Sequence, residues 1–298
     1  MLYRAPVALI LILLLAIACK KETTEILHEN VVVEGNQPPQ HASVPTLTIE
    51  NYITKLYIDL IGLEPDLTTM NNHVQQLKDN DLSETVREQI ITDLQDERAY
   101  YQQFWNRTAS DMLDGVTDPE IQDQINTFLF IIQQSKANGD TLNAYYFEQE
   151  VAKLSNVLAA TTDWQNGIID IRGFYQRFAL NYFYDEINMG SENFVIACFE
   201  NLLGRLPTAS ELDNGVTMVD GFPSQVLRVD GNDKIDLVDI LTNSNEFYER
   251  LVIRTYQQLL TRDPSTGELS LGAAQVQATK DLKSLQVELL KSKEYAGF

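Results

Sequence analysis

Three stretches of this chain repeat one pattern around a proline, and that repeat limits the fold more than any other feature. They align without gaps as YIDLIGLEP (57–65), FENLLGRLP (199–207) and YQQLLTRDP (256–264). In each, apolar side chains recur three and four residues apart, the spacing of one face of an α-helix. These positions are Tyr52, Ile53, Leu56, Tyr57, Leu60 and Ile61; Phe194, Val195, Cys198, Phe199, Leu202 and Leu203; and Leu251, Val252, Thr255, Tyr256, Leu259 and Leu260.

The residues after each helix predict a turn and a second helix. Gly62 and Gly204 stand where a helix ends in a left-handed residue, a conformation that glycine adopts without strain, and Thr261 takes this place in the third copy. The proline that follows blocks continuation of the helix. Capping boxes then begin at Thr208 and Ser265, and in the first copy Asp66 can serve as the cap, followed by Thr69 in place of glutamate.

Each copy closes alike, near residues 94–97, 241–247 and 290–295. One unit is therefore helix, Gly/Pro turn, helix, loop, helix. The sequence predicts an all-α fold, a multi-helix array with three copies of this unit.

Other segments are predicted mainly as helices. Helical spacing and capping residues predict helices from residue 118 to the Asn-Gly pair at 138–139, over 142–158 and over 171–187. Only residues 225–229 and 234–237 suggest a β-hairpin, across the Asp-Gly pair at 230–231.

The repeated motifs resemble known domains. The run LLGRLPTASEL (202–212), followed by SNEF (244–247), resembles an uncharacterised helical domain of secreted and surface bacterial proteins, which is itself similar to phycobilisome linkers. The third copy matches it through LLTR (259–262) and SKEY (292–295). The first copy, with YIDLIGLEP and FWNRTASDML (104–113), resembles a cytochrome-associated domain of unknown function in planctomycete surface proteins. These resemblances imply a helical fold and no particular chemistry.

The N-terminus predicts an exported lipoprotein. A single early charge, Arg4, precedes an apolar run over 7–18 that is shorter than the about 20 residues of a membrane-spanning helix. The run ends in AIAC (16–19), which resembles a lipobox and implies lipidation of Cys19. The alternatives are an ordinary secretory signal or an uncleaved anchor. The predicted divisions are 1–18 signal peptide, 19–46 lipidated cysteine and tether, 47–190 helical domain with the first copy, and 191–298 helical domain with the second and third copies.

The tether after Cys19 refines the expected location. Its basic-then-acidic start, KKE (20–22), resembles the surface-export signal of Bacteroidetes lipoproteins. We therefore expect a lipid-anchored outer-membrane protein that faces the cell exterior; the alternative is a lipoprotein facing the periplasm.

Charge and cysteine content exclude several classes of function. The formal net charge of −21 over 298 residues opposes binding to phosphate backbones, so we expect no nucleic-acid partner. Only two cysteines are present, and with Cys19 assigned to lipid, Cys198 is expected to be a buried core thiol. The three histidines are scattered, and no haem, phosphate-loop or nucleophile-elbow motif occurs. We expect no cofactor and no catalytic site.

Two candidate sites remain. Asp230, Asn232, Asp233 and Asp236 form an oxygen-rich loop that could hold Ca²⁺, although an Asp-Gly turn before a helix explains the same residues. Phe174, Tyr175, Tyr182 and Tyr184 could form a ligand platform, although aromatic residues at this spacing usually belong to a core.

The sequence favours a non-catalytic helical scaffold or adaptor that binds a protein partner in the envelope. The alternatives are a glycan- or peptide-binding lipoprotein of a nutrient-uptake system and a subunit of a surface enzyme complex.

Overall fold

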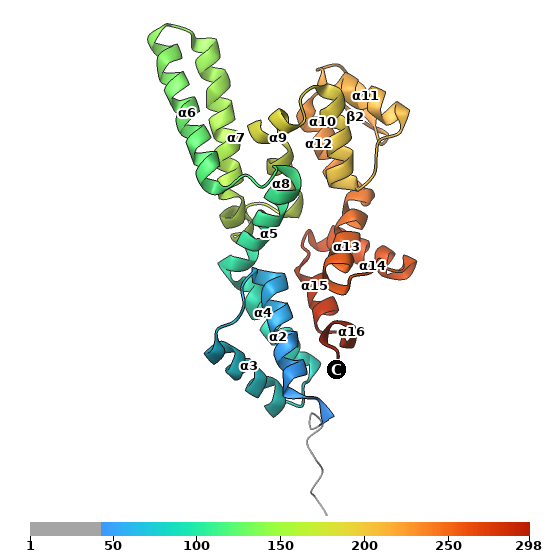
Figure 1. Cartoon of the computed structure of the whole chain (residues 1–298). Coiled ribbons are helices and arrows are strands. Elements are labelled where there is room, and N and C mark those ends of the chain that lie inside the picture. The colour runs from blue at the N-terminus through green and yellow to red at the C-terminus, as the bar shows by residue number, and fades with distance from the viewer. Residues whose placement is uncertain (1–42) are drawn as a thin grey trace, which may run out of the picture. The chain divides into compact units, whose positions relative to one another are not determined.

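The computed structural model describes residues 43–298, which belong to one compact unit. The regular structure is almost entirely helical (Figure 1), which confirms the predicted all-α fold. The described residues form one small sheet, with strands β1 (Ser224–Val226) and β2 (Val229–Gly231). The helices are α2 (Thr46–Ile61), α3 (Leu67–Asp79), α4 (Glu84–Asp96), α5 (Arg98–Met112), α6 (Asp118–Ala137), α7 (Thr141–Gln165), α8 (Ile171–Ala179), α9 (Tyr182–Ile187), α10 (Ser191–Cys198), the π-helical turn η2 (Phe199–Leu203), α11 (Ala209–Val219), α12 (Lys234–Asn243), α13 (Asn245–Leu260), α14 (Thr266–Thr279), α15 (Lys283–Leu290) and α16 (Lys293–Ala296).

The three predicted copies begin with α2, with α10 and η2, and with α13. All the apolar positions predicted for these helices are buried, apart from the half-buried Leu260. Thr255 and Cys198 share the buried slot that Leu56 occupies in the first copy. The repeat is therefore a repeat of core positions.

Each first helix ends in a left-handed residue, as predicted for Gly62 and Gly204, and the replacement of glycine by Thr261 does not change the turn of the third copy. The φ angles are 74° at Gly62, 74° at Gly204 and 53° at Thr261. Proline follows three residues later in every copy, and a second helix then begins with α3, α11 or α14.

The predicted caps are present. Thr208 and Ser265 each form a complete capping box with the glutamate three residues later. Asp66 caps α3 by accepting from the backbone amides of Thr68 and Thr69. The Thr69 hydroxyl also donates to Asp66 over 2.9 Å, so threonine supports the cap in a different way from the glutamate of the other copies.

The second and third copies overlap by one helix. Ser244 caps α13, which closes the second copy and opens the third, and Ser292 caps α16 at the equivalent place after α15. The second and third copies therefore have no linker between them.

Two local predictions were wrong. The helix predicted over 171–187 divides into α8 and α9, because Asn181 accepts from the amides of Phe183 and Tyr184 and starts a new helix. The predicted hairpin is displaced along the chain.

The β-hairpin turns at Leu227 and Arg228, whose φ angles are 48° and 65°, and not at the Asp-Gly pair. Positive φ at both central residues suits the right-handed twist of the strands. Gly231 lies in β2, where an added Cβ would come within 2.8 Å of Asp236 and 2.9 Å of Met218. The predicted second strand, 234–237, instead starts α12, because the Asp233 side chain caps that helix.

The third copy also packs on the first. Helix α15 contacts α4, and α16 contacts α2. Gln95 donates to the side chain of Gln286 over 3.0 Å, and the Tyr295 hydroxyl donates to Asp59 over 2.8 Å. The proposed division between residues 190 and 191 stays a prediction, which the cooperativity of unfolding will test.

Candidate functional site

The aromatic residues proposed as a ligand platform lie mainly in the core. Phe174 and Tyr184 are fully buried, and Tyr175 is almost so. Tyr182 is half-buried, with its ring 5.0 Å from that of Phe128. Of these four residues, Tyr175 lines the pocket described below. The four side chains do not form a continuous exposed platform.

The oxygen atoms of the candidate calcium loop make turn and capping contacts. Asp233 accepts from the amide of Asp236, and Asp236 accepts from the amide of Asn232, each over 2.8 Å. Asp230 accepts from Gln225 over 3.1 Å. Within residues 43–298, no group of three His, Cys, Asp or Glu side chains is placed to hold a metal ion. These contacts agree with the turn interpretation of the loop.

Of the two cysteines, the structure describes only Cys198. Cys19 lies outside the described residues, so its lipidation stays a prediction. Cys198 is completely buried and free, and burial raises the pKa of its thiol to about 12. Among the described helices, none combines the length and the apolar character that a membrane span requires.

The repeated Arg-x-Pro motif forms an ion triad that we did not predict. Arg205 binds Glu211 of the capping box over 2.8 Å and Glu246 of the next helix over 2.5 Å. Arg262 binds Glu268 and Glu294 in the same way, over 2.8 and 2.6 Å. The triads join three parts of each unit, and the first copy has Leu63 and Thr69 at the corresponding Arg and Glu positions. The repeated spacing of the motif therefore serves folding.

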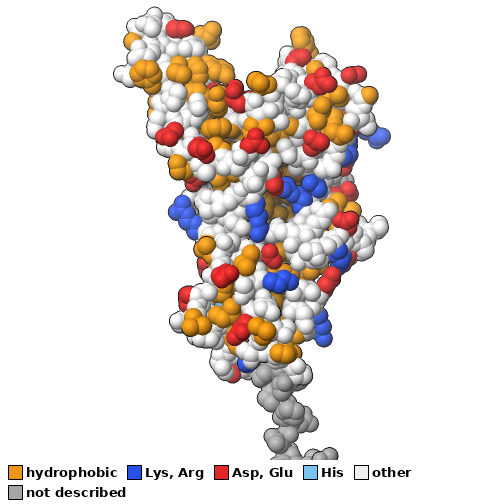
Figure 2. All heavy atoms as spheres, in the orientation of Figure 1, with side chains coloured by type: hydrophobic (Ala, Val, Ile, Leu, Met, Phe, Trp, Pro, Cys, Tyr) orange, Lys and Arg blue, Asp and Glu red, His pale blue; other side chains and the backbone are white. Residues whose placement is uncertain are grey.

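One exposed apolar surface lies on the hairpin of α6 and α7, which we call the α6–α7 hairpin. Figure 2 shows apolar side chains gathered over it. Helix α6 packs chiefly on α7, whereas α7 also contacts α5, α8 and α9, so the uncovered part of the pair includes the outer face of α6 and the start of α7. The exposed fractions are 49% for Leu129, 61% for Phe130, 79% for Leu142, 60% for Tyr145 and 55% for Tyr146.

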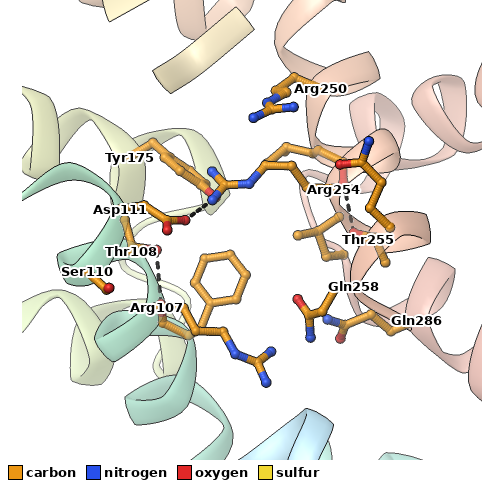
Figure 3. Close-up of a pocket in the computed structure, with 14 residues that line it drawn as sticks. Arg107, Thr108, Ser110, Asp111, Tyr175, Arg250, Arg254, Thr255, Gln258 and Gln286 are labelled. Carbon is orange, nitrogen blue, oxygen red and sulfur yellow. Dashed lines mark hydrogen bonds and ion pairs between the residues drawn. The ribbon is translucent and has the colours of Figure 1, made fainter. Parts of the chain in front are cut away.

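A pocket of about 310 Å³ lies between α5, α8, α13 and α15, and we call it the arginine pocket (Figure 3). Arg107 and Asp111 reach it from α5, Tyr175 from α8, and Arg250 and Arg254 from α13. The other lining residues are Phe104, Thr108, Ser110, Leu251, Thr255, Gln257, Gln258, Leu282 and Gln286.

The electrostatics of the arginine pocket reflect partial burial. Arg254 forms an ion pair with Asp111, yet burial lowers the pKa of Arg254. Burial also lowers the pKa of Arg107, although the charge of Asp59 opposes this shift. Burial raises the pKa of Tyr175 to about 12, so its hydroxyl is protonated at neutral pH. The arrangement is suited to binding negative charge.

Sequence reasoning missed both the hairpin surface and the pocket. The pocket residues come from four helices spread over residues 104–286, so no local spacing signals them. Comparison with protein-family models, with curated proteins and with solved structures gives no match.

Proposed function

We propose that this protein is a non-catalytic, lipid-anchored adaptor of the outer membrane that holds a protein partner in the envelope. The observation that carries this proposal is the exposed apolar surface of the α6–α7 hairpin. Five large side chains there are about half exposed or more, although folding gains nothing from leaving them in water. Exposed apolar patches of this kind mark interaction sites.

The chemistry of the surface favours a protein as the occupant. Tyr and Phe are enriched at the cores of protein interfaces, where they bury a large area with few rotatable bonds. A net charge of −21 opposes close approach to an anionic lipid surface. The expected partner therefore presents a complementary apolar face to Phe130, Tyr145 and Tyr146.

Site-specific photo-crosslinking in native membranes tests the adaptor proposal. A photoreactive residue at Phe130 or Leu142 should yield one discrete protein adduct. The same residue at Leu271, which is 76% exposed on α14, is the matched control and should not. Tyr145→Ser combined with Tyr146→Ser should abolish the adduct. Adducts to lipid alone, or equal adducts from position 271, would contradict the proposal.

The anchor is tested separately. Cys19→Ala should leave an unprocessed precursor that a fatty-acid probe does not label. Export to the exterior face predicts that protease added to intact cells degrades the wild-type protein. A processed and labelled Cys19→Ala variant would remove the lipoprotein assignment but leave the hairpin experiment unaffected.

The arginine pocket supports a second candidate, the glycan- or peptide-binding lipoprotein of a nutrient-uptake system. A tethered protein with a charged pocket could capture an acidic ligand. Here the readout is direct binding of small molecules, with no protein partner required.

A further inference from the structure

The arginine pocket concentrates positive charge in an acidic chain. The protein has 22 Lys and Arg residues against 43 Asp and Glu residues, yet the pocket is lined by three arginines and one aspartate. A second cavity, of about 620 Å³ near α8 and α14, has the opposite balance. Arg172 and Lys280 line it together with Asp170, Asp239 and Asp281. The excess of positive charge therefore distinguishes the arginine pocket from this second cavity.

Arg250 contributes a charge that the fold leaves uncompensated. Its Nε is buried without a hydrogen-bond partner, and its guanidinium forms no ion pair with any residue in 43–298. The side chain lies against Gly204: a Cβ built there would be 2.6 Å from the Arg250 Cδ and 2.7 Å from its Nε. An unpaired, partly buried guanidinium loses hydration without gaining a partner, and a bound anion would restore one.

Gln286 adds a neutral hydrogen-bond donor to the pocket. The Gln286 side chain is buried, and its Oε1 accepts from Gln95 over 3.0 Å and from Tyr100 over 2.8 Å. These two bonds fix the amide, and its Nε2 has no acceptor among the described residues. Figure 3 shows Gln286 reaching toward Gln258 at the edge of the pocket.

Asp111 is the one carboxylate in the lining, and it is already bound to Arg254. The donors that remain therefore call for an acceptor with negative charge. Guanidinium groups match carboxylate and phosphate oxygens because their paired N–H groups can donate to two oxygens at once.

We propose that the arginine pocket binds a small molecule through a carboxylate or phosphate group, with Arg250 as its principal contact. Arg254 and Arg107 add positive charge, and the Gln286 amide is a neutral donor. A volume of about 310 Å³ suits a small ligand. The site is separate from the α6–α7 hairpin, so it adds a function to the proposed adaptor.

Isothermal titration calorimetry on the purified full chain tests this site with inorganic phosphate and with succinate as probes, at low and constant ionic strength. Saturable binding of at least one probe is expected, and the stronger of the two identifies the preferred group. Arg250→Gln should weaken it by about tenfold or more, because it removes charge-assisted hydrogen bonds. Arg250→Lys keeps the positive charge but removes the paired N–H groups of the guanidinium, so it should cause an intermediate loss of affinity.

Arg172→Gln is the matched control, since it removes an arginine that lies in the other cavity and is bound to Asp170. The affinity of the Arg172→Gln variant for the probe should stay within about twofold of that of the wild type. Added salt should weaken the binding of the probe to both proteins. Circular-dichroism melts establish that each variant is folded. Absence of binding tighter than about 10 mM, or equal losses in Arg250→Gln and Arg172→Gln, would overturn the proposal.

Discussion

Two independent constraints favour glycine at position 204, which ends the first helix of the second copy. The φ of 74° at Gly204 favours glycine, and the Arg250 side chain occupies the place of a Cβ. Gly62 is the same, with Gln103 in the role of Arg250. Gln103 and Arg250 hold equivalent positions, since each is the sixth residue after the N-cap of its helix. The N-cap is Glu97 for α5 and Ser244 for α13.

Thr261 escapes the second constraint. The sixth residue after Ser292 is Phe298, and α16 has already ended at Ala296. Helix α16 therefore has no residue equivalent to Arg250, and Thr261 adopts the left-handed conformation with a side chain, at φ 53°. The sequence alone predicts the turn. It does not predict which side chain packs against the turn, because that depends on tertiary packing.

Gly204→Ala should therefore destabilise the fold more than Gly115→Ala does. Gly115 has φ 77° and nothing within 4 Å of a built Cβ, so its substitution measures left-handed strain alone, about 1 kcal/mol. Displacing Arg250 should add about 1 kcal/mol or more. Denaturant midpoints of the two variants decide. Equal losses would mean that Arg250 moves aside without cost.

Cys198 should be inert until the chain unfolds. It is fully buried and the pKa of its thiol is raised to about 12, so the reactive thiolate is scarce at neutral pH. In a Cys19→Ser background, a thiol reagent should label the native protein slowly and the denatured protein at once. Fast labelling of the native state would show an opening that exposes α10.

At the scale of elements, local signals predicted most of what the structure contains. The apolar slots, the left-handed turns and the caps at Asp66, Thr208 and Ser265 all follow from short-range physics. The β-hairpin was misplaced because Leu227 and Arg228 adopt positive φ without glycine, against their usual preference. The ion triads and the arginine pocket were missed because their members meet only through tertiary packing.

The triad of the second copy predicts a stability that depends on pH. Hydrogen bonds from Arg205 hold the pKa of Glu211 at about 2, below its ordinary value of 4.5. Because the pKa of Glu211 is lowered in the folded protein, its ionised carboxylate stabilises the fold at pH values above about 4.5. This contribution is lost as the pH falls from about 4.5 toward 2. Because the pair is partly exposed, about 1 kcal/mol is expected.

Glu211→Gln isolates that charge, since glutamine can still complete the capping box. It should lower the free energy of unfolding at neutral pH by about 1 kcal/mol and make no difference near pH 2. Ser244→Ala is the control, because loss of the neutral hydroxyl cap of α13 should cost about the same at both pH values. Urea unfolding across the pH range is the measurement, and a difference for Glu211→Gln that persists in acid would refute the assignment.

At the scale of the whole molecule, the contacts between the first and third copies should make unfolding cooperative. Open repeat arrays unfold in parts because each unit touches only its neighbours. Here Gln95 and Gln286 are bonded although most of the chain lies between them. The two tryptophans, Trp105 and Trp164, both lie in residues 47–190, so their fluorescence reports on that part alone.

Unfolding followed by tryptophan fluorescence and by helical circular dichroism should give the same midpoint. Gln286→Ala, a change in the third copy, should lower both midpoints equally, because it removes the acceptor of the buried Tyr100 hydroxyl and one of the two acceptors of the Gln95 amide. Separate midpoints would instead support two independent domains, divided at residue 190.

The contact between the first and third copies also bears on how such a protein can evolve. An open solenoid lengthens when a unit is duplicated, because the new unit only has to match its neighbours. In this chain α15 contacts α4 and α16 contacts α2. An inserted unit would have to move α15 and α16 away from these helices of the first copy. Duplication would thus break a long-range interface before it could create a new one. Diversification is then expected where neither interface is involved, in α6, α7 and the loop that joins them.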